Sequence, residues 1–332
     1  MRSRRPLRWL PAIFALAVVV ASCGNPSSPA PASPTSAPSA ASPSPSASAS
    51  PSPSPSPSPS PTPPAVDLTK APFTVLLLGG DSGLRTDSLI VVGIDPTKHR
   101  VSYASLPRDT IDVPLPGGGR FGPRKVNSFY TFARSDPGRY PAGPGEATRE
   151  MMGLLLGIHI DYFALTTFGG FENLVNAMGG VKVNVPSAVV DPVYQVTLTD
   201  IGIRFKAGPQ VMTGPRALIY TRTRKGDSDF ARSRRQQVFL TAAGGQLLTR
   251  PNLFAALLAA RQNLVTDFPL EQVPAIVAAF GSVPKGSAIT GLVLGPRAYS
   301  SRAACPCGYA LEPNVTAMRK AAAKLFPWAV TP

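Results

Sequence analysis

The stretch FTVLLLGGDSGLRTDSLIVVGIDPTKHRVSYASLP, residues 73–107, decides the fold, because it contains three short apolar runs separated by turn signals. Residues 73–80, 88–95 and 100–107 have the length and the residue types of β-strands. The turn DPTKH between the second and the third run predicts a hairpin. The first run ends in glycines, so a buried strand that leads into a loop is expected there.

Helical patterns alternate with further strands downstream. Helices are predicted at residues 145–157, where Gly157 is the C-terminal stop, and at 169–180 and 229–248. Strands are predicted at residues 159–168 and 181–186. From Pro251 the tail alternates helical stretches with short β-like runs; the quoted cases are residues 252–264, 271–280 and 287–294. This interleaving predicts an α/β fold, a single domain with a central mixed sheet flanked by helices.

The N-terminus predicts export. Residues 1–23 combine a basic start with a short apolar run and end in VVASC, which resembles a lipoprotein-type signal peptide with Cys23 as the lipidated residue. A simple signal anchor with an incidental cysteine is the alternative. Residues 24–66 are a Pro/Ser/Ala-rich linker that we expect to be disordered and extended. The body of the protein is therefore predicted to act outside the cytoplasm.

The charge balance favours anionic partners. The chain has 33 bases and 18 acids, and only four of the bases lie in the signal region. An exported basic domain meets phosphate polymers and acidic lipid surfaces more often than nucleic acid. An export signal, and a sequence without helix-turn-helix or zinc motifs, argue against a transcriptional regulator, so no nucleic-acid partner is expected.

Several chemistries are excluded by the motifs. The sequence has no phosphate-binding GxxxxGK[ST] motif, no GxSxG and no HExxH. The two histidines, His99 and His159, are interpreted as structural. With Cys23 acylated, Cys305 and Cys307 remain as a local pair, either reduced or in an unusual bridge.

Acids and arginines at strand ends remain as the candidate site. Asp81, Arg85 and Asp87 follow the first strand, and Asp81 and Asp87 could share a hard cation such as Mg²⁺ that bridges to a phosphate. Arg108, in SLPRDT, follows another strand; a salt bridge to Asp109 or to another neighbour is the structural alternative. Further arginines lie in the basic stretch 220–240.

Within that basic stretch, Arg222 and Arg224 are expected on one face of an extended segment, where both can grip phosphate oxygens. Arg232 and Arg235 share a face of the following helix. Several arginines suit a pyrophosphate with a divalent metal, provided that this segment and the two loops converge.

Four stretches in chain order, residues 76–116, 125–130, 155–186 and 205–237, resemble the LytR-CpsA-Psr family. The resemblance implies a catalytic core at 67–240 and a helical C-terminal part of the same domain at 241–332. It implies catalytic roles for Arg108, Arg222, Arg224 and Asp229, and binding of a substrate pyrophosphate by Arg85, Arg108, Arg222, Arg224, Arg232, Arg235 and Gln236. It implies that Asp81 and Asp87 hold the metal, Mg²⁺ or Mn²⁺. Lys125 and Asn127 match a further family motif.

The resemblance also implies a function. A member of this family is expected to be a phosphotransferase, with residual pyrophosphatase activity, that moves a glycopolymer from a polyprenyl-pyrophosphate carrier to a muramic acid hydroxyl of peptidoglycan. Asp229 or Asp81 would help to deprotonate that hydroxyl. Segments 150–157 and 168–178 are candidates to line the cleft for the polyprenyl tail, although they would be ordinary core in most proteins. The lipid anchor would hold the protein on the outer face of the membrane, reaching into the wall.

Two departures from the family bear on this expectation. Only five residues separate Asp81 from Asp87, so the acidic loop is shorter than in relatives. A lipoprotein signal replaces the transmembrane helix of most relatives. The alternative function is a non-catalytic tethered module that binds polyprenyl (pyro)phosphate or anionic wall polymers.

Overall fold

The three apolar runs form the centre of a six-stranded mixed sheet with the strand order β11-β6-β1-β2-β3-β12. This computed structural model describes residues 66–197, 199–224, 228–249, 261, 264–281, 289–301 and 304–331. The predicted signal peptide with Cys23, the linker up to residue 65 and most of the predicted helix 252–264 lie outside these residues. The strands of the sheet are β1 Phe73–Gly80, β2 Thr86–Asp95, β3 Arg100–Leu106, β6 Tyr162–Thr167, β11 Leu264–Thr266 and β12 Ile289–Val293.

The predicted hairpin is confirmed, and the sheet is mixed as expected. β2 is antiparallel to both β1 and β3, whereas β6 runs parallel to β1 and β12 parallel to β3. β11 and β12, both from the tail, form the two edges. The sheet therefore requires residues on both sides of the long helix α6 (Asp229–Thr249).

Alternation along the central strands gives the sheet two apolar faces. In β1, Phe73 and Val75 pack into one core, and Leu76 and Leu78 into the other. A strand with both faces covered reads as a nearly continuous apolar run, which explains the sequence LLL. The six-stranded sheet thus lies between two helical layers.

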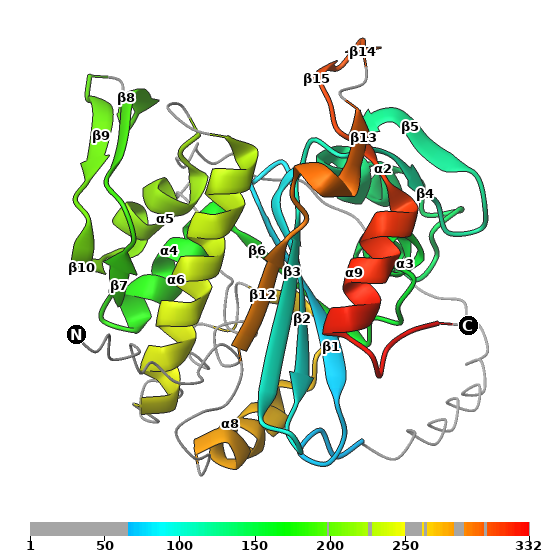
Figure 1. Cartoon of the computed structure of the whole chain (residues 1–332), viewed down its shortest axis with the longest axis horizontal. Coiled ribbons are helices and arrows are strands. Elements are labelled where there is room, and N and C mark those ends of the chain that lie inside the picture. Colours follow the sequence, from blue (N-terminus) through cyan, green and yellow to red (C-terminus); the bar gives the residue numbers. More distant parts are fainter. Residues whose placement is uncertain are drawn as a thin grey trace, which may run out of the picture. The chain divides into compact units, whose positions relative to one another are not determined.

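Helices cover both faces of this sheet (Figure 1). One layer contains α4, α5 and α6, and the other contains α2, α3 and α9. Gly157 takes φ 65° at the end of α3, as the predicted stop requires. The other helices are α2 Phe129–Ser135, α3 Pro144–Leu156, α4 Phe168–Ala177, α5 Gly214–Arg222, α8 Val273–Gly281 and α9 Val315–Leu325, with short 3-10 turns η1 Val126–Ser128, η3 Leu270–Gln272 and η4 Pro296–Ala298.

A long two-stranded ribbon lies outside the helical layer of α4 and α5 (Figure 1). β7 Val181–Val185 pairs with β10 Gly208–Met212, and β8 Val189–Gln195 pairs with β9 Ile201–Phe205. Small two-stranded pairs complete the fold: β4 Ile111–Pro114 with β5 Arg120–Lys125, β13 Tyr299–Ser301 with β16 Glu312–Pro313, and β14 Ala304–Cys305 with β15 Gly308–Tyr309.

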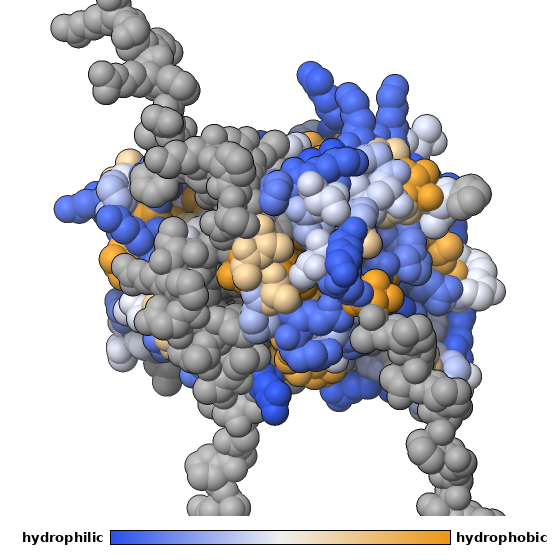
Figure 2. Space-filling view, turned by 90° about the horizontal axis from the view of Figure 1, so that it is seen from below, coloured by the Kyte–Doolittle hydropathy of each residue, from blue (hydrophilic) through white to orange (hydrophobic). Residues whose placement is uncertain are grey.

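The surface seen in Figure 2 is mainly hydrophilic where the atoms are coloured, with hydrophobic residues in small groups. Among the described residues, none of the helices has both the length and the apolar character needed to cross a bilayer. The apolar residues of the described chain are gathered mainly in the two cores.

Candidate active site

Segments that are distant in sequence meet where the central strands of the sheet end. The last residues of β1 and β3 and the first residues of β2 lie at the same end of the sheet, because each of these neighbours is antiparallel to the next. β6 runs parallel to β1, so its last residues also reach this end of the sheet, and α4 begins there at Phe168. Loops that follow these strands are therefore held close together by the rigid sheet.

Asp87 is the extra residue of a β-bulge. Gly79 pairs with Ser88 and Gly80 pairs with Thr86, so the regular register skips Asp87. A Cβ added at Gly80 would lie 2.4 Å from the carbonyl oxygen of Arg85, so this tight connection needs a glycine. Bulges re-aim a side chain relative to the strand alternation. The bulge thus sets the direction of the Asp87 carboxylate.

Two of the predicted arginines hold that carboxylate. Arg108, just after β3, forms an ion pair with Oδ1 of Asp87. Nε of Arg222 lies 3.6 Å from Oδ2 of the same residue. The convergence on which the pyrophosphate hypothesis depends is therefore present for the strand-end loop and the basic stretch. Nε of Arg108 and Nε of Arg222 are buried and have no hydrogen-bond acceptor among the described residues.

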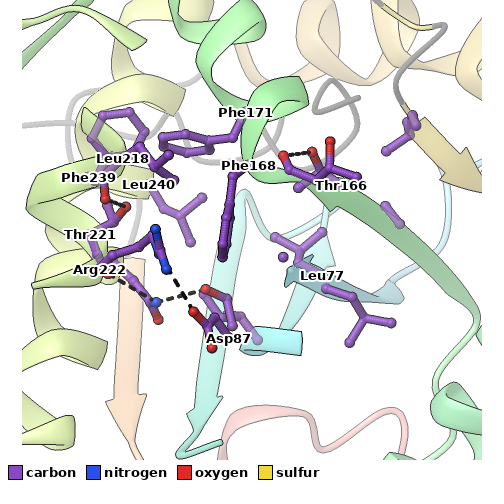
Figure 3. A pocket seen from close by; sticks show the side chains of 18 residues that line it. Leu77, Asp87, Thr166, Phe168, Phe171, Leu218, Thr221, Arg222, Phe239 and Leu240 are labelled. Atoms are coloured by element: carbon purple, nitrogen blue, oxygen red, sulfur yellow. Dashed lines mark hydrogen bonds and ion pairs between the residues drawn. The ribbon is translucent and has the colours of Figure 1, made fainter. Parts of the chain in front are cut away.

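The expectation that Arg222 and Arg224 lie together in an extended segment is wrong. Arg222 is the last residue of α5, and Thr223 ends the helix with ψ 141°. The guanidinium carbon of Arg222 lies 3.9 Å from the centroid of the Phe168 ring (Figure 3). Arg224 turns instead to Asp109 and Asp229, at 3.4 and 3.1 Å. The change of direction at the helix end sends the two guanidiniums to different carboxylates.

Asp109 and Asp229 both contact Arg224, and each carboxyl group shifts the pKa of the other. Burial would raise the pKa of Asp109, but hydrogen bonds from Asp229 and Lys125 hold that pKa below its ordinary value. Burial and the hydrogen bond to Asp109 raise the pKa of Asp229, against the cations Arg232 and Arg224. The two pKa shifts point in opposite directions, so a proton shared by the two carboxyl groups resides on Asp229 and Asp109 is ionised.

Asp109 is surrounded by cations. Nζ of Lys125 lies 2.8 Å from Oδ1 of Asp109, and Nε of Arg108 lies 3.8 Å from Oδ2. With Arg224, these groups connect Asp109 to the Asp87 cluster through Arg108. Both structural alternatives for Arg108, pairing with Asp109 and with another neighbour, occur at once.

The predicted residues of α6 lie deeper. Arg232 is 2% exposed, and one of its terminal nitrogens is 3.5 Å from Asp229; burial lowers the pKa of Arg232. Arg235 is 6% exposed and donates to the carbonyl oxygens of Tyr220, at 3.0 Å, and Thr223. It thus holds the end of α5, the element that carries Arg222. Neither Arg232 nor Arg235 lines the two cavities described next.

A polar cavity of about 470 Å³ opens beside Asp87. Its lining contains most of the predicted strand-end residues together with the segment that follows β5. The lining residues are Asp81, Arg85, Asp87, Arg108, Asp109, Pro123, Arg124, Lys125, Asn127, Ser128, Arg222 and Cys307. Cys307 is disulfide-bonded, and the side chain of Cys305 lies outside the described residues.

A second, apolar cavity of about 90 Å³ adjoins the first (Figure 3). Leu77, Phe168, Phe171, Leu218, Phe239 and Leu240 supply much of its wall. Gln236 lines it as well, and its Nε2 donates to Ser88 Oγ at 2.7 Å. Asp87 and Arg222 belong to both linings. The junction of a polar and an apolar space is therefore formed by one carboxylate and one guanidinium.

Only one of the two segments expected beside the prenyl tail lines this cavity. Phe168 and Phe171 come from the segment 168–178. From the segment 150–157, Met151, Met152 and Leu155 are fully buried in the core on the other face of the sheet. They lie away from the apolar cavity, because α3 and α4 cover opposite faces of the sheet.

Asp81 and Asp87 line the same polar cavity, and the donor set fits a cation that is shared with a phosphate. Mg²⁺ binds one or two carboxylates and completes its shell with water and phosphate oxygens. Oδ1 of Asp81 accepts the backbone N–H of Arg85 at 3.0 Å, and the side chain of Arg85 is exposed. In the part of the chain that the structure describes, no group of three or more His, Cys, Asp or Glu could cage a metal.

Comparison with known protein families identifies the family to which this chain belongs. The LytR_cpsA_psr family matches residues 37–290, which is most of the chain. The chain belongs to the LytR_cpsA_psr family. It is 33% identical over 202 residues to the polyisoprenyl-teichoic acid–peptidoglycan teichoic acid transferase TagV of Bacillus subtilis, covering 57% of this chain and 47% of TagV. It therefore spans about half the length of that relative.

Other members of the family agree with this assignment. The transferase TagU of Enterococcus faecalis is 30% identical over 230 residues, covering 64% of this chain and 69% of TagU. The crystal structure of B. subtilis TagV superposes with a TM-score of 0.61 and 28% identity, covering 79% of this chain and 99% of that chain. TagT bound to LIIa-WTA gives a TM-score of 0.60 and 25% identity, covering 80% and 94%. The predicted α/β fold of this family member is confirmed.

Sequence reasoning assigned no site role to Asp109, which lines the polar cavity of this LytR_cpsA_psr protein, and it considered Phe168 only as part of the segment 168–178 beside the prenyl tail. Asp109 faces the polar cavity, whereas Asp229, which was assigned a catalytic role, does not line it. Phe168 supports Arg222. The triplet P-R-D directly after a buried strand was a usable signal for Asp109. Nothing local distinguishes Phe168 from a core aromatic residue.

Proposed function

We propose that this protein is a phosphotransferase that moves a glycopolymer from a polyprenyl-pyrophosphate carrier to a hydroxyl of peptidoglycan. The observation that carries the proposal is the shared wall of the two cavities, formed by Asp87 and Arg222. A lipid pyrophosphate matches this pair of a polar and an apolar cavity, because it has a charged head joined to an apolar tail. The names of TagV and TagU, and the ligand of TagT, support this class of substrate.

The arginines are the groups that bind the pyrophosphate. Arg108 and Arg222 are ion-paired to Asp87, and each has a buried Nε without an acceptor among the described residues. Guanidinium groups bind phosphate oxygens in a bidentate manner. Donors held in place before the reaction stabilise the charge that develops during phosphoryl transfer. Arg85 and Lys125 extend this positive wall around the polar cavity.

The transfer step exchanges one P–O bond for another. The acceptor hydroxyl oxygen bonds to the phosphorus that carries the glycopolymer, and the bond from that phosphorus to the bridging oxygen breaks. Polyprenyl phosphate leaves, and the phosphodiester joins polymer to peptidoglycan. Asp109 takes the hydroxyl proton, because it is the ionised member of the carboxyl pair and lines the cavity. Asp229 positions Asp109 through their hydrogen bond.

Asp81 and Asp87 would hold Mg²⁺ or Mn²⁺ against the pyrophosphate. Bound there, the metal would neutralise phosphate charge during the transfer. The Asp87 carboxylate would thus join the metal to Arg108 and Arg222, which both contact it.

We infer that Cys23 carries the lipid anchor and that the protein acts on the outer face of the membrane. The short apolar run that ends in VVASC supports this inference. Replacing Cys23 with serine and following the protein in membrane and soluble fractions tests it. A wild-type protein without lipid on Cys23 would contradict it.

The transfer proposal is tested with the full chain, a polyprenyl-pyrophosphate oligosaccharide, Mg²⁺ and peptidoglycan fragments. Mass spectrometry then looks for the phosphodiester product in wild type and in Arg108→Ala. Product from wild type alone supports a transferase. Donor binding without product, lost in the variant, supports the alternative function, a tethered module that binds the carrier lipid.

A further inference from the structure

The two-stranded ribbon β7–β10 exposes an unusual outer surface. Five apolar side chains of the ribbon, which comprises residues 181–212, are far more exposed than core residues: Val190 46%, Val193 53%, Val196 37%, Ile201 62% and Val211 65%. Four of them gather at the β8–β9 end of the ribbon. Exposed apolar groups of this kind mark a contact surface more often than an isolated surface residue does.

Cations stand beside these apolar side chains. Val190 pairs directly with Arg204 across the ribbon, and Val211 pairs with Lys182. Residues directly opposite each other on an antiparallel pair share a face. Lys206 lies exposed in the connection between β9 and β10. Val190 and Val211 thus share the outer face of the ribbon with Arg204 and Lys182, so this face is both apolar and basic.

Acids contribute little to this face. The sequence from Val181 to Met212 contains only two, Asp191 and Asp200. Asp191 is 1% exposed and accepts a hydrogen bond from the hydroxyl of Thr223, so it points to the interior. Asp200 alone is exposed. The net charge of the outer face is positive.

The inner side of the ribbon contacts the candidate active site. Thr223, which bonds to Asp191, directly follows Arg222. Burial raises the pKa of Tyr194, and the adjacent Arg222 cation and its hydrogen bond to Tyr194 act to lower it. The ribbon thus connects the apolar and basic surface to the junction of the two cavities.

We propose that the outer face of the ribbon β7–β10 docks onto the surface of a bilayer that contains anionic lipids. Val190 and Val211 enter the boundary between headgroups and acyl chains, while Lys182, Arg204 and Lys206 contact lipid phosphates. A second copy of this chain is a poorer partner, because a two-fold contact would place the same cations against each other.

Vesicle flotation tests the proposal on residues 67–332, which contain every residue of both cores. The vesicles are equimolar phosphatidylglycerol and phosphatidylcholine, with pure phosphatidylcholine as the neutral comparison; neither contains a pyrophosphate donor. We expect binding to the anionic vesicles that weakens at high salt. We expect about tenfold weaker binding for Arg204→Glu and for the double variant Val190→Asp/Val211→Asp.

Leu154→Asp is the matched control, because Leu154 is 39% exposed on α3, which covers the other face of the sheet. It should bind vesicles like the wild type, and circular dichroism checks that all variants are folded. No flotation of the wild type, or an equal loss in Leu154→Asp, overturns the proposal. Self-association that the ribbon variants abolish, without vesicle binding, also overturns it in favour of a contact between copies.

The inference stands independently of the transferase proposal, since the vesicles test lipid binding alone. Failure of catalysis with intact flotation would leave the docking surface in place.

Discussion

The guanidinium of Arg222 packs on the ring of Phe168, 3.9 Å from its centroid, while its Nε lies 3.6 Å from a carboxylate oxygen of Asp87. One side chain thus faces both the apolar and the polar cavity. Stacking fixes the plane of the guanidinium, which a lysine ammonium cannot reproduce. The position of Arg222 is therefore set by shape as well as by charge.

Arg222→Lys should reduce turnover about a hundredfold, because the planar donor pair aimed at the phosphates is lost. Arg216→Lys is the control: Arg216 packs on Phe205 at 4.1 Å and lines neither cavity. Turnover of both variants is measured by formation of the phosphodiester product. Equal losses in the two would contradict a specific role for Arg222.

Asp109→Asn should lower the rate about a hundredfold or more, since the ionised carboxylate that accepts the proton is removed. Asp229→Asn should cost far less, because the asparagine amide can still donate to Asp109. Reaction rates of both variants, measured at a saturating donor concentration, show which of the two carboxyl groups acts as the base. If Asp229→Asn is the more damaging change, the assignment of the base to Asp109 fails.

Stability should depend on pH through Asp229. Its pKa is raised in the folded protein above the ordinary 3.8, so folding favours the protonated form. The contribution is fully present below the ordinary pKa and is lost as the pH rises through the folded value. Thermal midpoints of wild type should therefore fall relative to those of Asp229→Asn as the pH rises above 3.8. Parallel plots of thermal midpoint against pH for the two proteins would show that the pKa of Asp229 does not differ between the folded and the unfolded state.

Chelation with EDTA should abolish turnover, and Mg²⁺ or Mn²⁺ should restore it. Asp81→Asn should raise the metal concentration needed by about tenfold, because one of two carboxylate ligands is lost. Binding of Mn²⁺ in the presence of donor, followed by electron paramagnetic resonance, gives a readout apart from activity. Asp112→Asn is the control, since Asp112 pairs with Arg120 and lines neither cavity; a matching loss there would argue against Asp81 as a ligand.

Arg235→Lys should lower the free energy of unfolding by about 1–3 kcal/mol, because buried carbonyl groups of Tyr220 and Thr223 lose donors. Arg234→Lys, on the exposed side of the same helix turn, should change stability little. Urea titrations measure both. Unchanged stability with weakened donor binding would instead support the pyrophosphate contact that the family resemblance implies for Arg235.

Local pattern was sufficient for most elements of this fold. The run that became β1 is apolar at nearly every position before its terminal glycines, because both faces of a central strand are covered. Gly157 ended α3 where predicted, since only glycine adopts the left-handed conformation at little cost. The end of α5 could not be predicted from the sequence, because nothing in TRTR shows that Arg222 is still helical and that Thr223 is not.

The sequence by itself determined the kinds of groups in the candidate site: acids and arginines directly after buried strands. Which of them meet was decided only by the tertiary structure. A one-residue bulge aimed Asp87 at Arg108 and Arg222, and the turn after α5 sent Arg224 to Asp109 and Asp229. Helix α6 buried Arg232 and Arg235 away from both cavities. Residue chemistry is local, but direction and burial depend on how strands and helices from distant parts of the chain pack.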